Sequence, residues 1–331
     1  MDERHAIETR VGRLAVRVAG EDPTAVLWPS LFMDERSWDR LLPALTQDRR
    51  LVIINGPGHG ASGDTGRRYS NQDCVTAAEQ VLEYLAITGS VDWVGNAWGG
   101  HVGLRFAADL PARCRSLITL GTPVAALSRR ERRRTYPLLL VHGVLGPIDL
   151  VISGVTEVLL SPHTRAHDTE AVELVRDSLR HANRRMLRNA VISISLRREE
   201  LTSLLSDIAV PTLLITGSDH SGFTPAQAQD AARLIRNGRT AVVPDTAYLV
   251  PPRRRPPHRR SSASSGHGAW LSVPEPDELV GGSVPGPGLH RSRRCSYCHG
   301  YVRRRACSAH DAGAAVALRA RPDPPARARL R

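Results

Sequence analysis

The amino-acid sequence predicts an α/β protein: a mostly parallel, doubly wound sheet with an inserted helical lid, followed by a disordered tail. Three observations support this fold class. Short apolar runs alternate with segments of helical periodicity, the pattern between residues 123 and 207 is helical only, and the composition changes abruptly after residue 250. We therefore expect the two parts of the core at 1–122 and 208–250, the lid at 123–207 and the tail at 251–331.

Six apolar runs bounded by turn residues have the length and composition of strands buried on both faces. They are Ala25–Trp28, Leu51–Ile54, Val91–Trp98 (which includes a sharp turn), Ser116–Leu120, Thr212–Thr216 and Thr240–Val243. Helices are expected at Thr76–Ile87, from the turn to Leu110, and at Ala226–Ile235. Because strands alternate with helices, the connections predict a parallel sheet covered on both faces.

The lid region contains apolar residues at helical spacing, from Val172 and Val175 to Met186. Its longest apolar stretch, Leu138–Leu160, includes His142, charged residues, a proline and three glycines. A membrane span of about 20 residues tolerates few such groups. The apolar runs instead favour a hydrophobic ligand beneath the lid.

The most informative segment is Val91–Gly100, where a strand runs into a helix through a glycine-rich turn. In the G-x-S-x-G nucleophile elbow, small residues allow a strained turn that exposes a serine hydroxyl at the edge of the sheet. Gly95, Gly99 and Gly100 supply that room here. The position of the serine is occupied by Ala97, which has no heteroatom.

Together with four other segments, this turn resembles the α/β-hydrolase fold over roughly residues 10–250. The segments are Leu27–Leu31, similar to the oxyanion loop; Asn55–Ser62, similar to an Asp-x-Pro-Gly-x-Gly-x-Ser loop; Pro211–Asp219, similar to the strand that delivers the triad acid; and Asp245–Pro251, similar to the turn that delivers the histidine. The order and spacing match those of ester and lactone hydrolases. The resemblance implies an enzyme of that class.

The resemblance assigns the acid position to Asp219, the nucleophile position to Ala97 and the histidine position to Tyr248. A phenol, with a pKa near 10, cannot replace imidazole as a base near neutral pH. Pro29 stands where the family places its loop histidine, and Asn55 stands where it places its loop aspartate. Because the mechanism needs a hydroxyl and a base, we expect serine-dependent catalysis to be lost or severely impaired, by about a million-fold.

An anion-binding site would survive these changes. The backbone N–H groups of Leu31 and Trp98 are the expected oxyanion hole, and Pro29, Ser30 and His101 are the expected substrate-binding residues. A takeover of the base role by His101 or His220 is the alternative to a packing role for these histidines. The predicted ligand is a small hydrophobic ester, lactone or carboxylate-like molecule, and no cofactor is expected. A non-catalytic, ligand-binding pseudoenzyme is the second interpretation.

Charge leads to a third interpretation, which rests on the tail. Nearly all of the net charge of +12 lies after residue 250, every cation of the chain is arginine, and Cys295, Cys298, Cys307 and His310 have spacing that a zinc site could use. Tail-mediated nucleic-acid or zinc binding is therefore the remaining alternative. Out-of-frame translation of GC-rich coding sequence explains the same composition, so nucleic acid is not the expected partner. Without an apolar leader after the charged N-terminus, a cytoplasmic protein without a membrane partner is expected, and the oligomeric state is left open.

Overall fold

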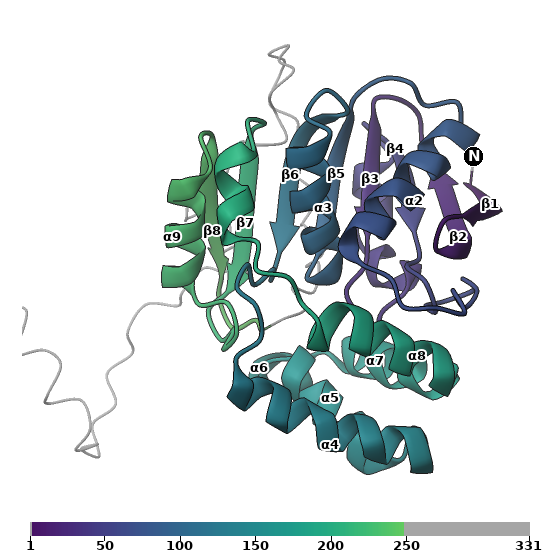
Figure 1. Cartoon of the computed structure of the whole chain (residues 1–331), viewed down its shortest axis with the longest axis vertical. Coiled ribbons are helices and arrows are strands. Elements are labelled where there is room, and N and C mark those ends of the chain that lie inside the picture. Colours follow the sequence, from purple (N-terminus) through teal and green to yellow (C-terminus); the bar gives the residue numbers. More distant parts are fainter. Residues whose placement is uncertain (1, 248–331) are drawn as a thin grey trace, which may run out of the picture. The chain divides into compact units, whose positions relative to one another are not determined.

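The computed structural model describes residues 2–247, apart from the side chains of Arg134 and Leu138. These residues form an eight-stranded mixed sheet in the order β1-β2-β4-β3-β5-β6-β7-β8, with a group of helices beyond one end of its strands (Figure 1). The strands are β1 (Asp2–Thr9), β2 (Gly12–Ala19), β3 (Thr24–Trp28), β4 (Arg50–Ile54), β5 (Val91–Asn96), β6 (Cys114–Leu120), β7 (Thr212–Gly217) and β8 (Gly238–Val243). The predicted fold class is thereby confirmed for the described residues.

All six predicted strands are present as β3 to β8, and they pair in parallel. β1 and β2 were not expected from the sequence; they add an antiparallel hairpin beside β4. β1 lacks the apolar run by which β3 to β8 are predicted, because it lies at the sheet edge and only one of its residues, Ile7, is buried. An edge strand exposed in this way carries polar residues where a central strand carries apolar ones.

The two faces of the sheet carry separate hydrophobic clusters. The larger cluster includes residues of α2 (Asn71–Tyr84), α3 (Trp98–Asp109) and α9 (Pro225–Leu234). Among the described residues, the other face is covered by the short helices η1 (Glu35–Trp38) and α1 (Leu42–Leu45), through Trp38 and Leu42. α2 begins five residues before the predicted helix, because Ser70 and Asp73 form a reciprocal capping box there.

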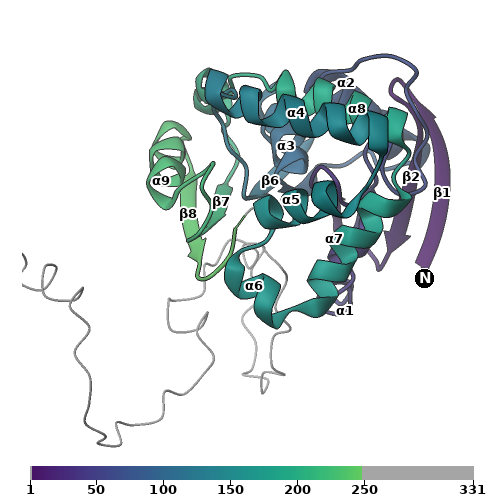
Figure 2. The ribbon, with the colours of Figure 1, turned by 90° about the horizontal axis from the view of Figure 1, so that it is seen from below.

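Five helices and a π-helical turn lie between β6 and β7 and form the lid (Figure 2). They are α4 (Arg129–Leu145), α5 (Asp149–Leu159), α6 (Pro162–His167), α7 (Thr169–His181), α8 (Arg184–Ala190) and η2 (Val191–Leu196), followed by the 3-10 helix η3 (Thr202–Asp207). The apolar spacing from Val172 to Met186 continues across two helices rather than one. Asn183 separates them, because its side chain accepts hydrogen bonds from the amides of Arg185 and Met186 and starts α8.

The stretch Leu138–Leu160 is divided between α4 and α5 by a turn at Gly146, whose φ is +80°. Across residues 2–247, no helix has both the length and the apolar character that crossing a bilayer requires. The predicted tail, its cysteines and Tyr248 lie outside the described residues.

Candidate active site

The turn between β5 and α3 has the strained geometry of a nucleophile elbow. Ala97 has φ +46° and ψ −98°, a region that costs a residue with a Cβ about 1–3 kcal/mol. Its conformation is fixed from both sides, because its N–H donates to the Leu120 carbonyl at 2.7 Å and its own carbonyl accepts from the His101 amide at 3.0 Å. The turn therefore has the backbone geometry of a nucleophile elbow, with the methyl group of Ala97 at the position of the serine hydroxyl.

Two glycines let this turn pack tightly against the sheet. A Cβ on Gly95 would lie 2.1 Å from the carbonyl of Gly99, and a Cβ on Gly99 would lie 2.0 Å from the carbonyl oxygen of Trp28. Both distances are far below a van der Waals contact, so neither position accepts a side chain. Trp93 secures the same helix start, because its indole N–H donates to the Gly99 carbonyl at 3.0 Å.

A cavity of about 330 Å³ lies over the elbow, between the core and the lid. Five of the predicted site residues border it together: Ser30, Leu31, Ala97, Trp98 and His101. Most of its other lining residues are apolar and come from the lid, for example Leu139, Val155, Leu159, Leu179, Leu187 and Ile194. The expectation of a hydrophobic pocket beneath the lid agrees with this lining.

The oxyanion loop follows β3 and carries a second strained residue, Phe32, with φ +73°. Its amide donates to Nε2 of His59 at 3.1 Å, and Nδ1 of His59 donates to the Pro57 carbonyl at 3.0 Å. Among the described residues, the amides of Leu31 and Trp98 donate to no carbonyl of a neighbouring turn or loop. These two N–H groups are therefore available to a bound oxygen.

Asn55 is buried and retains the bracing role of the loop. Its Oδ1 accepts the amide of Glu35 at 2.7 Å, and its Nδ2 donates to the Glu35 carboxylate at 2.8 Å. Ser62 ties the other end of the same loop, since its hydroxyl donates to the Asn55 carbonyl and accepts from the amide of Ala15. Its geometry is that of a turn residue engaged on both sides.

Asp219 and His220 follow β7, and they differ in burial: Asp219 is exposed, whereas His220 is buried. Asp219 is exposed, does not border the cavity, and accepts a hydrogen bond from Ser218. His220 is buried; its Nδ1 accepts the amides of Gly222 and Phe223, and its Nε2 donates to the Gly121 carbonyl at 3.3 Å. Burial lowers the pKa of His220 to about 4. The structure thus does not bring Asp219 to the pocket, although its neighbour Ser221 borders it.

His101 is also a neutral, buried histidine. Its Nε2–H donates to the Pro123 carbonyl at 2.8 Å, while its Nδ1 has no hydrogen-bond partner among the described residues. Burial, and secondarily the charge of Arg198, lower its pKa to about 3. A ring with so low a proton affinity is suited to accepting a hydrogen bond rather than to removing a proton at neutral pH. Pro29 is buried beside the loop but does not border the cavity.

Sequence analysis did not identify the polar groups that the lid contributes to the cavity: Glu131, Thr135 and His142 on α4, and Arg198 just after η2. The three α4 positions share one helical face, a spacing visible in the sequence. That spacing could not be assigned to a pocket, because the lid's position over the elbow is a tertiary property.

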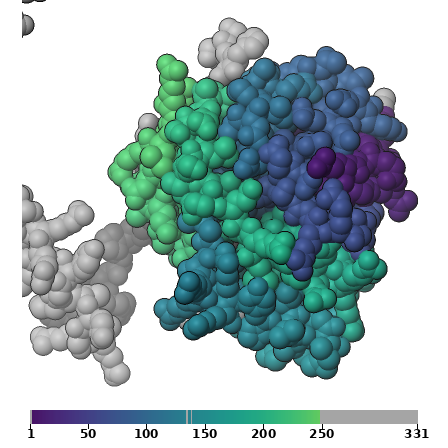
Figure 3. Space-filling view, in the orientation of Figure 1, coloured from purple at the N-terminus to yellow at the C-terminus, as the bar shows by residue number. Residues whose placement is uncertain are grey.

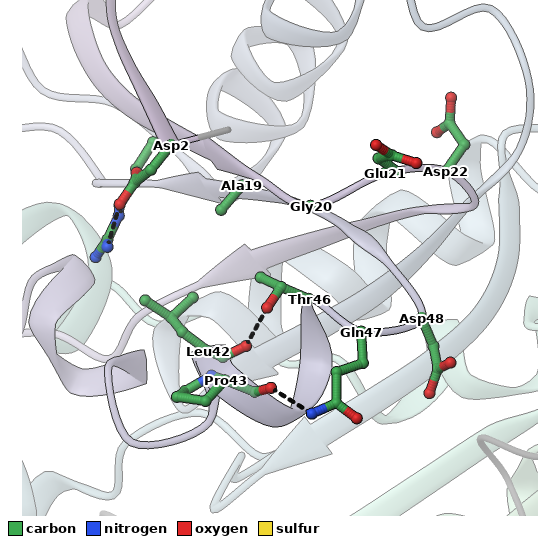
Figure 4. A pocket seen from close by; sticks show the side chains of 11 residues that line it. Asp2, Ala19, Gly20, Glu21, Asp22, Leu42, Pro43, Thr46, Gln47 and Asp48 are labelled. Carbon is green, nitrogen blue, oxygen red and sulfur yellow. Dashed lines mark hydrogen bonds and ion pairs between the residues drawn. The ribbon is translucent and has the colours of Figure 1, made fainter.

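A larger hollow, of about 660 Å³, lies at the opposite end of the strands (Figure 4). It is formed by the turn Gly20–Asp22 before β3 and by Leu42–Asp48 before β4, so it borders the amino ends of these parallel strands. Ligand sites of open α/β sheets lie at the carboxyl ends, where the elbow is. We therefore assign the candidate site to the smaller, apolar cavity.

Comparison with known proteins agrees with this geometry. The sequence profile of the alpha/beta hydrolase fold family matches residues 26–135. A pyrrolizixenacetamide deacetylase from Xenorhabdus hominickii is 26% identical over 228 residues, which cover 66% of this chain and 82% of that protein.

Solved structures show the same fold. A thermophilic esterase from Thermogutta terrifontis superposes with a TM-score of 0.69 and 21% identity, over 75% of this chain and 92% of that one. The enol-lactonase from Burkholderia xenovorans superposes with a TM-score of 0.66 and 21% identity, over 75% and 93%. With its strand order, its elbow between β5 and α3 and its helical insertion after β6, the described part of this chain has the α/β-hydrolase fold.

Proposed function

We propose that this protein binds a small hydrophobic ester, lactone or carboxylate-like ligand in the cavity over the elbow and has lost serine-dependent hydrolysis. The observation that carries the proposal is Ala97: the residue at the apex of the strained turn has no group that can attack a carbonyl. The similar proteins include a deacetylase, an esterase and an enol-lactonase, whose names all refer to acyl compounds.

The remaining groups support binding rather than turnover. The amides of Leu31 and Trp98 provide two donors for a carbonyl or carboxylate oxygen at the elbow end of a largely apolar cavity. His101 is neutral and offers a lone pair on Nδ1. Two donors and an acceptor beside Ala97 can orient an acyl group, but no described group there is both a nucleophile and activated by a base.

The proposal is tested by restoring the missing groups. We expect the natural chain to hydrolyse p-nitrophenyl butyrate at background rate, about a million-fold below a serine enzyme of this fold. Ala97→Ser alone and Tyr248→His alone should remain near background, because each restores only half of a nucleophile–base pair. The double variant should regain partial activity and become labelled by a fluorophosphonate.

The matched control is Ala108→Ser with Tyr248→His, which introduces the serine in the same helix but away from the cavity. It should remain unlabelled. Labelling of the natural chain, or its hydrolysis of the ester at ordinary enzyme rates, would refute the loss of catalysis. Binding is checked separately, by thermal stabilisation of the natural chain with butyrate or hexanoate.

A further inference from the structure

The helix α4 turns polar side chains toward a cavity whose lining is otherwise mostly apolar. Its cavity-facing residues are Glu131, Thr135, Leu139 and His142, three of which are polar. On the opposite side of the helix, Tyr136, Leu140 and Val144 are 53%, 67% and 75% exposed. Packing against apolar neighbours would favour the reverse arrangement, so the polar face toward the cavity calls for another explanation.

His142 is the group that most needs a partner. Its side chain is buried, with 4% exposure, and neither ring nitrogen has a hydrogen-bond partner among the described residues. Burial, and then the nearby charge of Arg184, lower its pKa, so the imidazole is neutral at pH 7. A neutral ring carries one N–H donor and one lone pair, and leaving both unpaired inside a protein costs free energy.

The surrounding charges restrict what can pair with it. Burial acts to raise the pKa of Glu131, but hydrogen bonds from Ser128 outweigh burial, so its pKa lies below the ordinary value and the carboxyl is ionised. A ligand carboxylate at this end would meet that negative charge. A ligand ammonium would meet the positive charges of Arg184 and of Arg198, which borders the cavity. Either ligand charge would thus be attracted by one of these groups and repelled by another, whereas an uncharged group that donates and accepts, such as a hydroxyl or an amide, matches both ring nitrogens of the neutral His142.

We propose that His142 forms, with Thr135, a polar subsite in the lid that binds the uncharged, hydrogen-bonding end of an elongated ligand whose acyl end lies at Leu31 and Trp98. The inference rests on the proposed function, since it assumes that the acyl end is held at the elbow. It narrows the ligand class to acyl compounds that carry a hydroxyl or amide at the far end of an apolar chain.

The test compares matched ligands that differ only at the distal end: the methyl esters of ω-hydroxyhexanoate and ω-hydroxyoctanoate against those of hexanoate and octanoate. Binding is followed by the change in intrinsic tryptophan fluorescence, to which Trp98 at the cavity wall contributes. We expect the natural chain to bind the hydroxylated ester of at least one length about fivefold more tightly, as one added hydrogen bond allows. His142→Leu should abolish that advantage, and His142→Gln, which keeps a donor and an acceptor, should retain part of it.

The matched control is His181→Leu, the same substitution on the lid helix α7 at an exposed position that does not border the cavity. It should keep the full advantage. Equal affinities of the natural chain for hydroxylated and plain esters, or an advantage that persists in His142→Leu, would overturn the subsite.

A second measurement needs no ligand. Because leucine removes two unpaired polar atoms, His142→Leu should raise Tm by about 2–4 °C, and a lowered Tm would count against the subsite. If no ester binds the natural chain, the proposed function fails, and the Tm of His142→Leu still decides whether this histidine is held unpaired. The two failures are therefore distinguishable.

Discussion

At the scale of single residues, Ala97 holds the strained backbone of a nucleophile elbow without a side chain that can act as a nucleophile. A positive φ at a residue with a Cβ persists only where the surroundings enforce it, and here the Leu120 carbonyl and the glycine-lined turn do so. Ala97 has no hydroxyl to present, so under the proposed loss of hydrolysis this strain serves no reaction. Its relief should therefore stabilise the fold.

We expect Ala97→Gly to raise the free energy of unfolding by about 1 kcal/mol, because glycine adopts positive φ without a Cβ clash. The same substitution at Ala108, within regular helix α3, should lower it by about 1 kcal/mol. Urea denaturation of both variants measures the two effects. Destabilisation of both by similar amounts would show that Ala97 is not strained.

Buried histidines give the protein a defined pH dependence. The pKa values of His101 and His220, about 3 and about 4, lie below the value near 6.5 of an unfolded histidine. Below pH 6.5 the unfolded chain therefore binds more protons than the folded one, so stability is full above pH 6.5 and is lost as the pH falls toward 4.

The expected slope between pH 6.5 and pH 5 is at most about 1.4 kcal/mol per pH unit for each such histidine. Urea titrations at pH 7, 6 and 5 measure this slope of the unfolding free energy against pH. His101→Gln should reduce the slope by the contribution of one histidine. Asp92 has a lowered pKa, in which burial is outweighed by Arg115 and Ser116, so it contributes only at lower pH. An unchanged slope in His101→Gln would contradict the assignment.

At the scale of elements, the lid is attached to the core by ion pairs at the start of α7. Arg40, between η1 and α1, contacts both carboxylate oxygens of Asp168 at 2.6 and 2.7 Å and also reaches Glu170 at 2.6 Å. Asp168 caps α7 by accepting the amide of Ala171. The side chains of Arg40 and Asp168 are each 23% exposed, so this attachment is only partly screened by solvent.

Arg40→Gln should therefore accelerate hydrogen exchange in α6 and α7 and lower the free energy of unfolding by about 1 kcal/mol at low salt. Arg176→Gln is the control, since Arg176 pairs with Glu173 inside α7 and, within residues 2–247, forms no ion pair with the core. Equal exchange in the two variants would mean that the ion pairs of Arg40 do not contribute to holding α6 and α7 on the core.

At the scale of the described molecule, the lid and the core each contribute one wall of the candidate site. In the space-filling view of Figure 3, residues of the lid form the lower part of the face shown. The elbow end of the cavity offers backbone donors, and the lid end offers polar side chains of α4. The proposed ligand class thus depends on both halves, whereas the proposed loss of hydrolysis depends on Ala97 in the core alone.

The sequence by itself determined the six parallel strands, the elbow and the absence of a hydroxyl at its apex, because these depend on local apolar runs and on glycine spacing. It did not reveal the edge hairpin β1–β2, because β1 is mostly polar and exposed and the apolar residues of β2 are interrupted by arginines. Nor could it show that His142 faces the cavity while Asp219 faces outward. Those facts were decided by tertiary structure, because the side of a helix or turn that meets a pocket depends on where segments distant in sequence pack.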